Sequence, residues 1–263
     1  MASVEVQAGI DAADGWARLP HAADGGPAAR LAIGVLTLAS DIATEGELRA
    51  FLPSGGVGVF ASRIPRAKAS TLANLRDMEG HIVEATARLV PDDDLHAIAF
   101  SCTSGTAAIG AGRVAELVAS VRPGVPVTDP LTAGMRALER FGARRIALLT
   151  PYRAEVNEVI AAAVEASGLT IVRRGGFFCG SGYDMSRISG RSVAEAALAL
   201  AAAPEVEALF VSCTALSLSP VIDDIETRLG KPVVFSTQAM AWDAMRLAGF
   251  KAAVPGRGRL LAQ

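Results

Sequence analysis

Two stretches of the sequence, Ile98-Ala-Phe-Ser-Cys-Thr-Ser-Gly105 and Leu209-Phe-Val-Ser-Cys-Thr-Ala-Leu216, repeat one pattern, an apolar run that ends in Ser-Cys-Thr. Each run has the length and composition of a strand buried in a parallel sheet. Cys102 and Cys213 come just after these runs. Because open α/β sheets bind ligands in the crevice outside the carboxyl ends of their strands, we expect both thiols to face one small molecule.

The similarity between the two halves of the chain continues beyond the cysteine motifs. Gly124-Val-Pro-Val127 precedes a helical pattern that ends at Gly142, and Gly230-Lys-Pro-Val233 precedes one that ends at Gly249. Strand and helix patterns alternate from residue 31 onward, which is typical of parallel sheets covered by helices. We interpret the chain as a duplication that forms two similar α/β lobes with a cleft between them. A chance repetition of Pro-Val before a strand is the alternative.

Apolar periodicity predicts the individual elements. Strands are expected over 31–36, 57–60 and 146–149, and helices around 114–121 and 155–167. Gly168 is expected to end the last of these helices in left-handed geometry. Residues 1–30 are rich in Ala, Gly and Asp without periodicity and are expected to form a flexible N-terminal tail.

Composition restricts the class of protein. A chain of 263 residues with 51% hydrophobic residues can bury a large core, yet no apolar run approaches the roughly 20 residues that span a bilayer. A net charge of −2 with scattered basic residues gives no reason to expect nucleic acid. Three widely spaced cysteines and an N-terminus without a basic, apolar leader favour a reducing compartment. We expect a cytoplasmic protein with neither nucleic acid nor membrane as partner.

No cofactor and no metal are expected. Only three lysines occur, and Lys231 in Gly-Lys-Pro reads as a turn residue rather than the pocket lysine that pyridoxal phosphate requires. The motifs H-E-x-x-H and C-x-x-C are missing from the sequence, and none of its three histidines follows a strand as a catalytic base would. Gly56-Val-Gly-Val-Phe-Ala61 matches a dinucleotide fingerprint only superficially, because its glycines lead into a strand.

The context of the two thiols favours chemistry over packing. A cysteine in an apolar strand is usually an inert small hydrophobe. Here hydroxyl side chains follow each one, Thr103 and Ser104 after Cys102 and Thr214 after Cys213. A turn into a helix at these points would present N–H groups that hold a carboxylate and lower a thiol pKa. We expect Cys102 to be the thiolate at neutral pH.

Tyr152 and Cys179 lie outside the two repeated cysteine motifs. Tyr152, in Thr150-Pro-Tyr-Arg-Ala-Glu-Val-Asn157, follows the strand over 146–149 and would lie at the same rim as the thiols. Packing of its ring at the start of a helix is the equal alternative. Cys179 lies in Phe-Cys-Gly-Ser-Gly182 without a preceding apolar run, and we interpret it as a non-catalytic loop residue.

These motifs resemble the aspartate/glutamate racemase superfamily. The resemblance rests on both cysteine motifs, on Thr150-Pro-Tyr-x-x-x-Val-Asn157, and on a final segment from Gly230-Lys-Pro-Val-Val to Ala-Trp-Asp-Ala-Met-Arg246. It extends over about residues 31–258. Within the superfamily the chain is most similar to the branch that holds maleate cis-trans isomerase, arylmalonate decarboxylase and the ectoine-utilisation racemase-like proteins.

The resemblance implies two pseudo-symmetric Rossmann-like lobes, each a mostly parallel sheet flanked by helices, with the active site in the inter-lobe cleft. Lobe 1 would comprise residues 31–142 and the C-terminal segment 237–263, and lobe 2 residues 143–236. It also implies a cofactor-independent enzyme, an isomerase or racemase that acts on a small carboxylate. The sequence does not fix the oligomeric state, and a homo-oligomer is one possibility.

The same resemblance suggests roles for the site residues. As in maleate isomerases, Cys102 would attack an alkene carbon and Cys213 would handle the proton, whereas in a racemase the pair would move a proton between opposite faces of one carbon. Tyr152 and Asp41 would contact the substrate, together with Thr103, Ser104 and Thr214. Asp41 occupies the position of a family Asn, and its carboxylate would repel a dianionic substrate unless it is protonated or turned away. Leu38-x-x-Asp41 is closer to the ectoine-utilisation branch. The alternatives are a cofactor-free decarboxylase of a malonate-type acid, although that enzyme lacks the first cysteine, and a non-catalytic carboxylate-binding protein.

Overall fold

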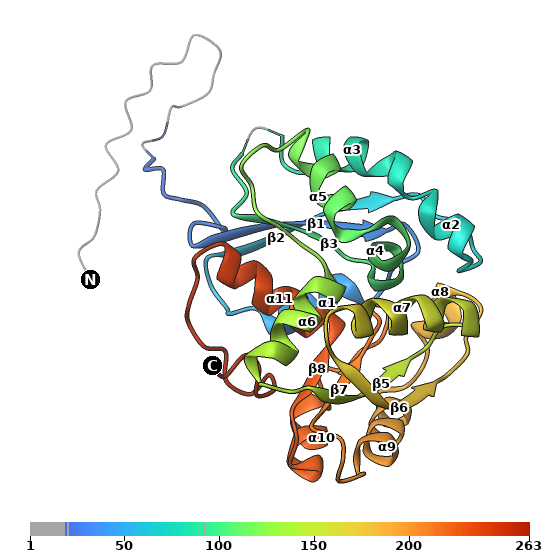
Figure 1. Ribbon diagram of the computed structural model, residues 1–263. Coiled ribbons are helices and arrows are strands. Elements are labelled where there is room, and N and C mark those ends of the chain that lie inside the picture. Colours follow the sequence, from blue (N-terminus) through green and yellow to red (C-terminus); the bar gives the residue numbers. More distant parts are fainter. Residues whose placement is uncertain (1–18, 20, 92) are drawn as a thin grey trace, which may run out of the picture.

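The computed structural model describes residues 19, 21–91 and 93–263, which form two halves, each built on a four-stranded sheet (Figure 1). The first sheet contains β1 (Leu31–Leu38), β2 (Val57–Ile64), β3 (Ala97–Phe100) and β4 (Val127–Thr128). The helices of this half are α1 (Thr44–Phe51), α2 (Leu72–Arg76), α3 (Glu79–Ala87), α4 (Thr103–Ile109), α5 (Ala111–Ala119) and α6 (Pro130–Arg140). The second sheet contains β5 (Arg145–Thr150), β6 (Thr170–Gly176), β7 (Ala208–Val211) and β8 (Val233–Phe235). Its helices are α7 (Ala154–Ala166), α8 (Gly182–Met185), α9 (Gly190–Ala201) and α10 (Ile222–Leu229), and α11 (Ser236–Leu247) follows β8.

The two sheets have equivalent topologies. Their strand orders are β2-β1-β3-β4 and β6-β5-β7-β8, and every neighbouring pair is parallel. Each of the strands β1, β3 and β7 is buried along its whole length, which explains why they read as continuous apolar runs rather than alternating ones. The predicted pair of pseudo-symmetric α/β lobes is confirmed, and the interpretation of the repeated Ser-Cys-Thr pattern as a duplication stays a prediction.

The predicted elements are present with shifted ends. The first two strands continue to Leu38 and Ile64, beyond the expected 31–36 and 57–60. Gly168 follows α7 with φ +87°, in the left-handed region that the sequence pattern required of it. Residues 1–18 and 20 of the predicted N-terminal tail lie outside the described residues. Among the described residues, no helix is long and apolar enough to cross a membrane.

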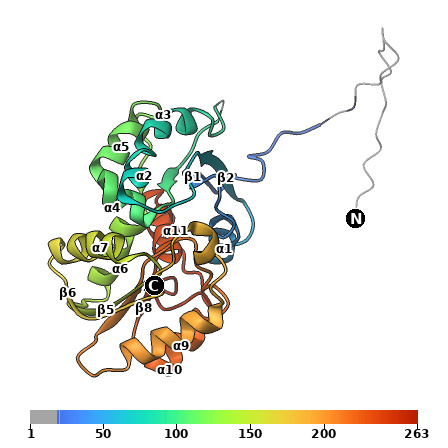
Figure 2. The same ribbon diagram turned by 90° about the vertical axis from the view of Figure 1, so that its right-hand side faces the viewer.

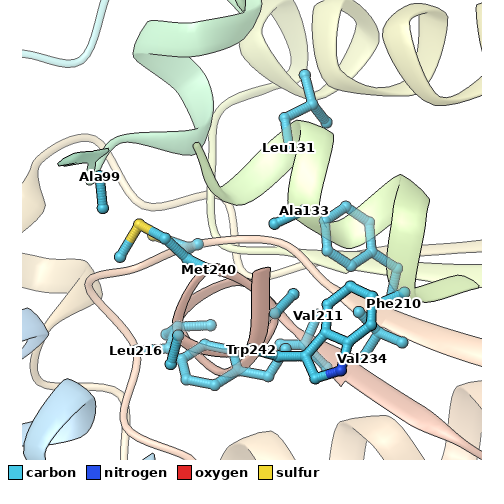
Figure 3. Close-up of a cluster of buried hydrophobic side chains, with 14 of the residues drawn as sticks. Ala99, Leu131, Ala133, Phe210, Val211, Leu216, Val234, Met240 and Trp242 are labelled. Carbon is cyan, nitrogen blue, oxygen red and sulfur yellow. The ribbon is translucent and has the colours of Figure 1, made fainter. Parts of the chain in front are cut away.

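Helices α6 and α11 lie between the two sheets, as both views show (Figures 1 and 2). Residues 236–245 of α11 are all buried, because this helix contacts α6, α1, β3, β4 and β8. Met240 and Trp242 of α11 pack in one cluster with Phe210 of β7 and Leu131 of α6 (Figure 3). This shared core holds the two sheets in a fixed relation, and so fixes the relation of their strand ends.

Candidate active site

Cys102 and Cys213 line one pocket between the two halves of the molecule. The pocket is small, with a cavity volume of about 30 Å³. All the predicted site residues line it, namely Asp41, Cys102, Thr103, Ser104, Tyr152, Cys213 and Thr214. The structure therefore brings together every residue that the sequence singled out, and their roles stay predictions.

Strand register explains why these residues meet. Leu36 of β1 pairs with Phe100 of β3, so the loop that follows β1 and the Ser-Cys-Thr that follows β3 leave the first sheet at the same edge. Leu149 of β5 pairs with Val211 of β7 in the same way, which places the Tyr152 loop beside the second Ser-Cys-Thr. Two equivalent sheet edges thus face each other across the pocket.

Cys102 is the N-cap residue of α4. Its Sγ accepts a hydrogen bond from the backbone N–H of Gly105 at 3.2 Å and lies 3.7 Å from the Ser104 hydroxyl. Gly105 is required here by close approach, since a Cβ on it would lie 3.0 Å from the Cys102 sulfur and 2.5 Å from Cε of Met78. The sulfur is therefore held in one position by the first turn of the helix.

Cys213 has a different surrounding. The expected helix does not follow it: residues 214–221 form turns and α10 begins only at Ile222. Its Sγ accepts the backbone N–H of Ala215 at 3.3 Å, and the Tyr152 hydroxyl is near enough to the same sulfur to act on its pKa. The expectation of a helix start behind both thiols is thus right for Cys102 and wrong for Cys213.

Burial controls the protonation of both thiols. Cys102 is 5% exposed and Cys213 is 4% exposed. Burial raises the pKa of Cys102 above its ordinary value, opposed first by hydrogen bonding to Ser104 and next by the charge of Arg66. Burial raises the pKa of Cys213 to about 12, although the Tyr152 hydroxyl acts to lower it. Both groups are consequently neutral thiols at pH 7, and the expectation that Cys102 is a thiolate in the free protein is wrong, because desolvation outweighs the N–H groups around it.

Tyr152 is fixed by the motif in which it occurs. Asn157, on α7, donates from Nδ2 to the Tyr152 carbonyl at 2.9 Å and accepts a hydrogen bond from the Thr150 hydroxyl. These bonds close the turn after β5 and explain why Thr and Asn flank Tyr in the sequence. Burial raises the pKa of Tyr152 well above its ordinary value, and the nearby Cys213 adds to this. The phenol therefore keeps its proton and can act toward Cys213 as a hydrogen-bond donor, not as a base.

Asp41 uses its carboxylate within its own loop. One oxygen accepts the backbone N–H groups of Ala43 and Thr44 at 2.8 and 2.9 Å, and the other accepts the hydroxyls of Thr37 and Thr44 at 2.9 and 2.6 Å. The carboxylate is turned toward the start of α1. A dianionic substrate requires that Asp41 be either protonated or turned away from it, and this orientation meets the second of these conditions. Direct contact between Asp41 and a substrate stays a prediction.

The predicted hydroxyl ligands differ in how far they are already engaged. Thr214 donates to the Ser101 carbonyl at 3.2 Å, and Thr103 lies 3.0 Å from the Ser236 hydroxyl at the start of α11. Both bonds join segments that are distant in the chain. Among the three predicted hydroxyl ligands, only Ser104 has a cysteine sulfur as its partner, so its hydroxyl faces the thiol directly.

The sequence reasoning missed part of the pocket wall. The residues it did not single out are Leu38, Ser40, Ile42, Arg66, Ser70, Gly182, Met185, Ser186 and Ala215. Two of the segments that supply them meet beside the pocket, where Ser70 N–H donates to the Gly180 carbonyl at 3.3 Å and Ala69 pairs with Ser181 in an antiparallel bridge. No local sequence pattern could have predicted this contact, because it joins loops that are more than 100 residues apart in the chain. Cys179 does not line the pocket, as expected.

Comparisons with known proteins agree with this geometry. The family described as arylmalonate decarboxylase matches residues 72–261. An arylmalonate decarboxylase from Bordetella bronchiseptica is 37% identical over 155 residues, which are 57% of this chain and 65% of that enzyme. A maleate isomerase from Nocardia farcinica is 29% identical over 244 residues, 88% of this chain and 95% of that enzyme. A solved mutant of the N. farcinica maleate cis-trans isomerase, with a covalently bound succinylcysteine intermediate, superimposes with a TM-score of 0.80 at 26% identity and covers 89% of this chain and 98% of its own.

Proposed function

The chain belongs to the arylmalonate decarboxylase family, and from this premise we propose that it is a cofactor-independent isomerase of a small carboxylate that uses two cysteines. The observation that carries the proposal is the position of Cys102 and Cys213 at equivalent strand ends on one pocket. Maleate is the substrate we favour, because the maleate isomerase from N. farcinica aligns with most of both chains.

The two thiols would divide the reaction between them. Cys102 first loses its proton to solvent water. The resulting thiolate bonds to one alkene carbon of maleate, the electron pair of the double bond moves to the neighbouring carbon, and the Cys213 thiol protonates that carbon. The product is a succinyl group on Cys102, the same kind of adduct that the N. farcinica mutant carries on a cysteine. Rotation about the new single bond, return of the proton to the Cys213 thiolate and loss of the Cys102 thiolate then release fumarate.

Tyr152 would support the second thiol in both directions. When Cys213 has given up its proton, the phenol hydroxyl donates to the remaining thiolate, and it does so in a pocket where burial otherwise disfavours charge. Ser104 can act in the same manner toward the Cys102 thiolate. Neither step needs a group from outside the pocket.

A decarboxylase of malonate-type acids is the second candidate. It is supported by the family description and by the apolar side chains of Leu38, Ile42 and Met185, which line one side of the pocket and could accept an aryl group. In that reaction the carboxylate leaves as carbon dioxide and one thiol protonates the resulting carbanion. A racemase of the ectoine-utilisation type and a non-catalytic carboxylate-binding protein are the remaining alternatives.

The test compares substrates in heavy water. We expect maleate to be converted to fumarate, whereas carbon dioxide release from a phenylmalonate would favour the decarboxylase. Proton exchange of a chiral carboxylate without either reaction would favour a racemase, and tight binding without turnover a binding protein. Intact-protein mass spectrometry after addition of maleate should show the succinyl adduct accumulate in Cys213→Ser and be lost in Cys102→Ser. Full activity of Cys213→Ser would rule out the two-thiol mechanism.

The compartment follows from the same chemistry. A mechanism with two free thiols requires that neither is drawn into a disulfide, and all three cysteines of the chain are free. A reducing compartment such as the cytoplasm supplies that condition.

A further inference from the structure

Arg66 is a cation in the pocket wall that the reaction as written does not use. It follows β2 and lines the pocket together with both thiols, and it is the only Lys or Arg among the described residues that do so. Its Nη2 donates to the Ser70 hydroxyl. Its Nε is buried and has no hydrogen-bond partner within the described part of the chain.

Within the part of the chain that the structure describes, Arg66 also has no acidic partner. In residues 19, 21–91 and 93–263 the ion pairs within 4.0 Å involve other arginines, and none joins a carboxylate to Arg66. The nearby carboxylate of Asp41 is occupied by four donors of its own loop. A buried N–H group without a partner is costly, and such a group in a pocket wall indicates a partner that comes from outside.

The second half of the molecule leaves room for this guanidinium. A Cβ on Gly182 would lie 2.8 Å from Nη1 of Arg66, so only glycine allows the group to lie directly against that backbone. A guanidinium presents its N–H groups in a planar fork that matches a carboxylate. Ser70 on one side and Gly182 on the other hold the fork at the pocket.

The charge balance of the proposed reaction requires such a group. A short dicarboxylate brings two negative charges to a site where a thiolate must also form, and each added negative charge raises a thiol pKa. Arg66 acts in the opposite direction, since its charge lowers the pKa of Cys102. A bound carboxylate beside the guanidinium would be compensated locally rather than left to oppose the thiolate.

We propose that Arg66 binds one carboxylate of the substrate and makes the site selective for short dicarboxylates over the corresponding neutral diamides. This assignment rests on the proposed function, which makes the ligand a small carboxylate. It gives Arg66 a role in substrate specificity that is separate from the bond-making roles of the thiols.

The test uses succinate, a saturated four-carbon dicarboxylate that cannot react, and its neutral diamide succinamide. Titration calorimetry on the full chain should show that the wild-type protein binds succinate more tightly than succinamide. Arg66→Gln should weaken succinate binding about 10- to 100-fold, the effect of losing a hydrogen bond to a charged group, and leave succinamide almost unchanged. Arg66→Lys, which keeps the charge without the fork, should lie between the two.

Arg191→Gln is the matched control, because it removes the same charge from an exposed position on α9 and should change neither affinity. Gly182→Ala is the second variant if Arg66→Gln does not fold, since the added methyl displaces the guanidinium and should reproduce the selective loss. Equal loss of both ligands in Arg66→Gln, unchanged succinate affinity, or no succinate binding by the wild-type protein would each overturn the assignment.

Failure of this inference is distinguishable from failure of the proposed function, because calorimetry needs no turnover. Arg66-dependent binding of succinate by a protein that isomerises nothing would leave the inference standing and remove the function. Isomerisation of maleate with the same KM in wild type and Arg66→Gln would leave the function standing and remove the inference.

Discussion

The protonation of Cys213 should be visible in the stability of the whole protein. Burial raises the pKa of this thiol from its ordinary value of 9.0 to about 12. Below pH 9 the group is a neutral thiol in both the folded and the unfolded state, so its stabilising contribution is complete. Above that pH the unfolded chain releases the proton while the folded chain keeps it, so the free energy of unfolding decreases until the pH passes the folded-state pKa.

The size of the effect follows from the shift. The decrease amounts to about 1.36 kcal/mol for each pH unit in this window, and therefore to about 2 kcal/mol at about pH 10.5. Urea unfolding of the wild-type protein and of Cys213→Ser across this range measures it. Serine keeps the size of the side chain and does not titrate there, so the difference between the two proteins isolates this thiol from the other groups that lose protons.

Cys179→Ser is the matched control, since it removes a thiol that is only partly buried and lies outside the pocket. Its difference from the wild type should change with pH less than that of Cys213→Ser. If wild type and Cys213→Ser lose stability in parallel between pH 9 and about 10.5, then Cys213 titrates like an ordinary thiol. In that case the pocket is open to water at the sulfur, and the argument from burial fails.

Three further substitutions test other parts of the site. Tyr152→Phe removes the hydroxyl that acts on Cys213 and should lower turnover about 10- to 100-fold without loss of folding, measured as kcat and Tm. Glu47 is buried and accepts three hydrogen bonds from residues 218–219, so Glu47→Ala should cost about 3 kcal/mol of unfolding free energy and Glu47→Gln about 1 kcal/mol. Equal costs for the two would exclude these bonds as the cause. Gly105→Ala should slow alkylation of Cys102 and cost about 1–3 kcal/mol, because its methyl would meet the sulfur at 3.0 Å.

The sequence was sufficient for the architecture because the decisive signals are local. A buried parallel strand is recognisable in the sequence as an apolar run. The repetition of Ser-Cys-Thr after two such runs predicted two similar lobes, and it predicted that Cys102 and Cys213 line one pocket. Tyr152 was found for the same reason, since it directly follows β5. Residues that come at the ends of strands are positioned by the sheet itself.

The features of the site that the sequence did not predict depend on contacts between segments that are far apart in the chain. Arg66 belongs to the loop after β2, and this loop is held at the pocket by the hydrogen bond from its Ser70 to Gly180 in the other half of the chain. The protonation of Cys102 was misjudged because the neighbouring N–H groups can be read from the sequence, whereas the depth of burial that outweighs them is a property of the assembled halves. The turn after Cys213 departs from its counterpart because equivalent strands keep their register while their loops diverge.

The divergence of the two loops bears on the choice between the proposed reactions. A racemase that works in both directions needs two bases of similar strength on opposite faces of one carbon. Here the two thiols are not equivalent: Cys102 has the Gly105 N–H and the charge of Arg66 beside it, whereas Cys213 has the Tyr152 phenol and a pKa of about 12. Burial raises the pKa of both thiols, but the first surrounding stabilises the thiolate that attacks carbon once it has formed, and the second favours a thiol that holds its proton until a carbanion forms. Unequal thiols therefore support a nucleophile and an acid, as addition and elimination across a double bond require, rather than a pair of matched bases.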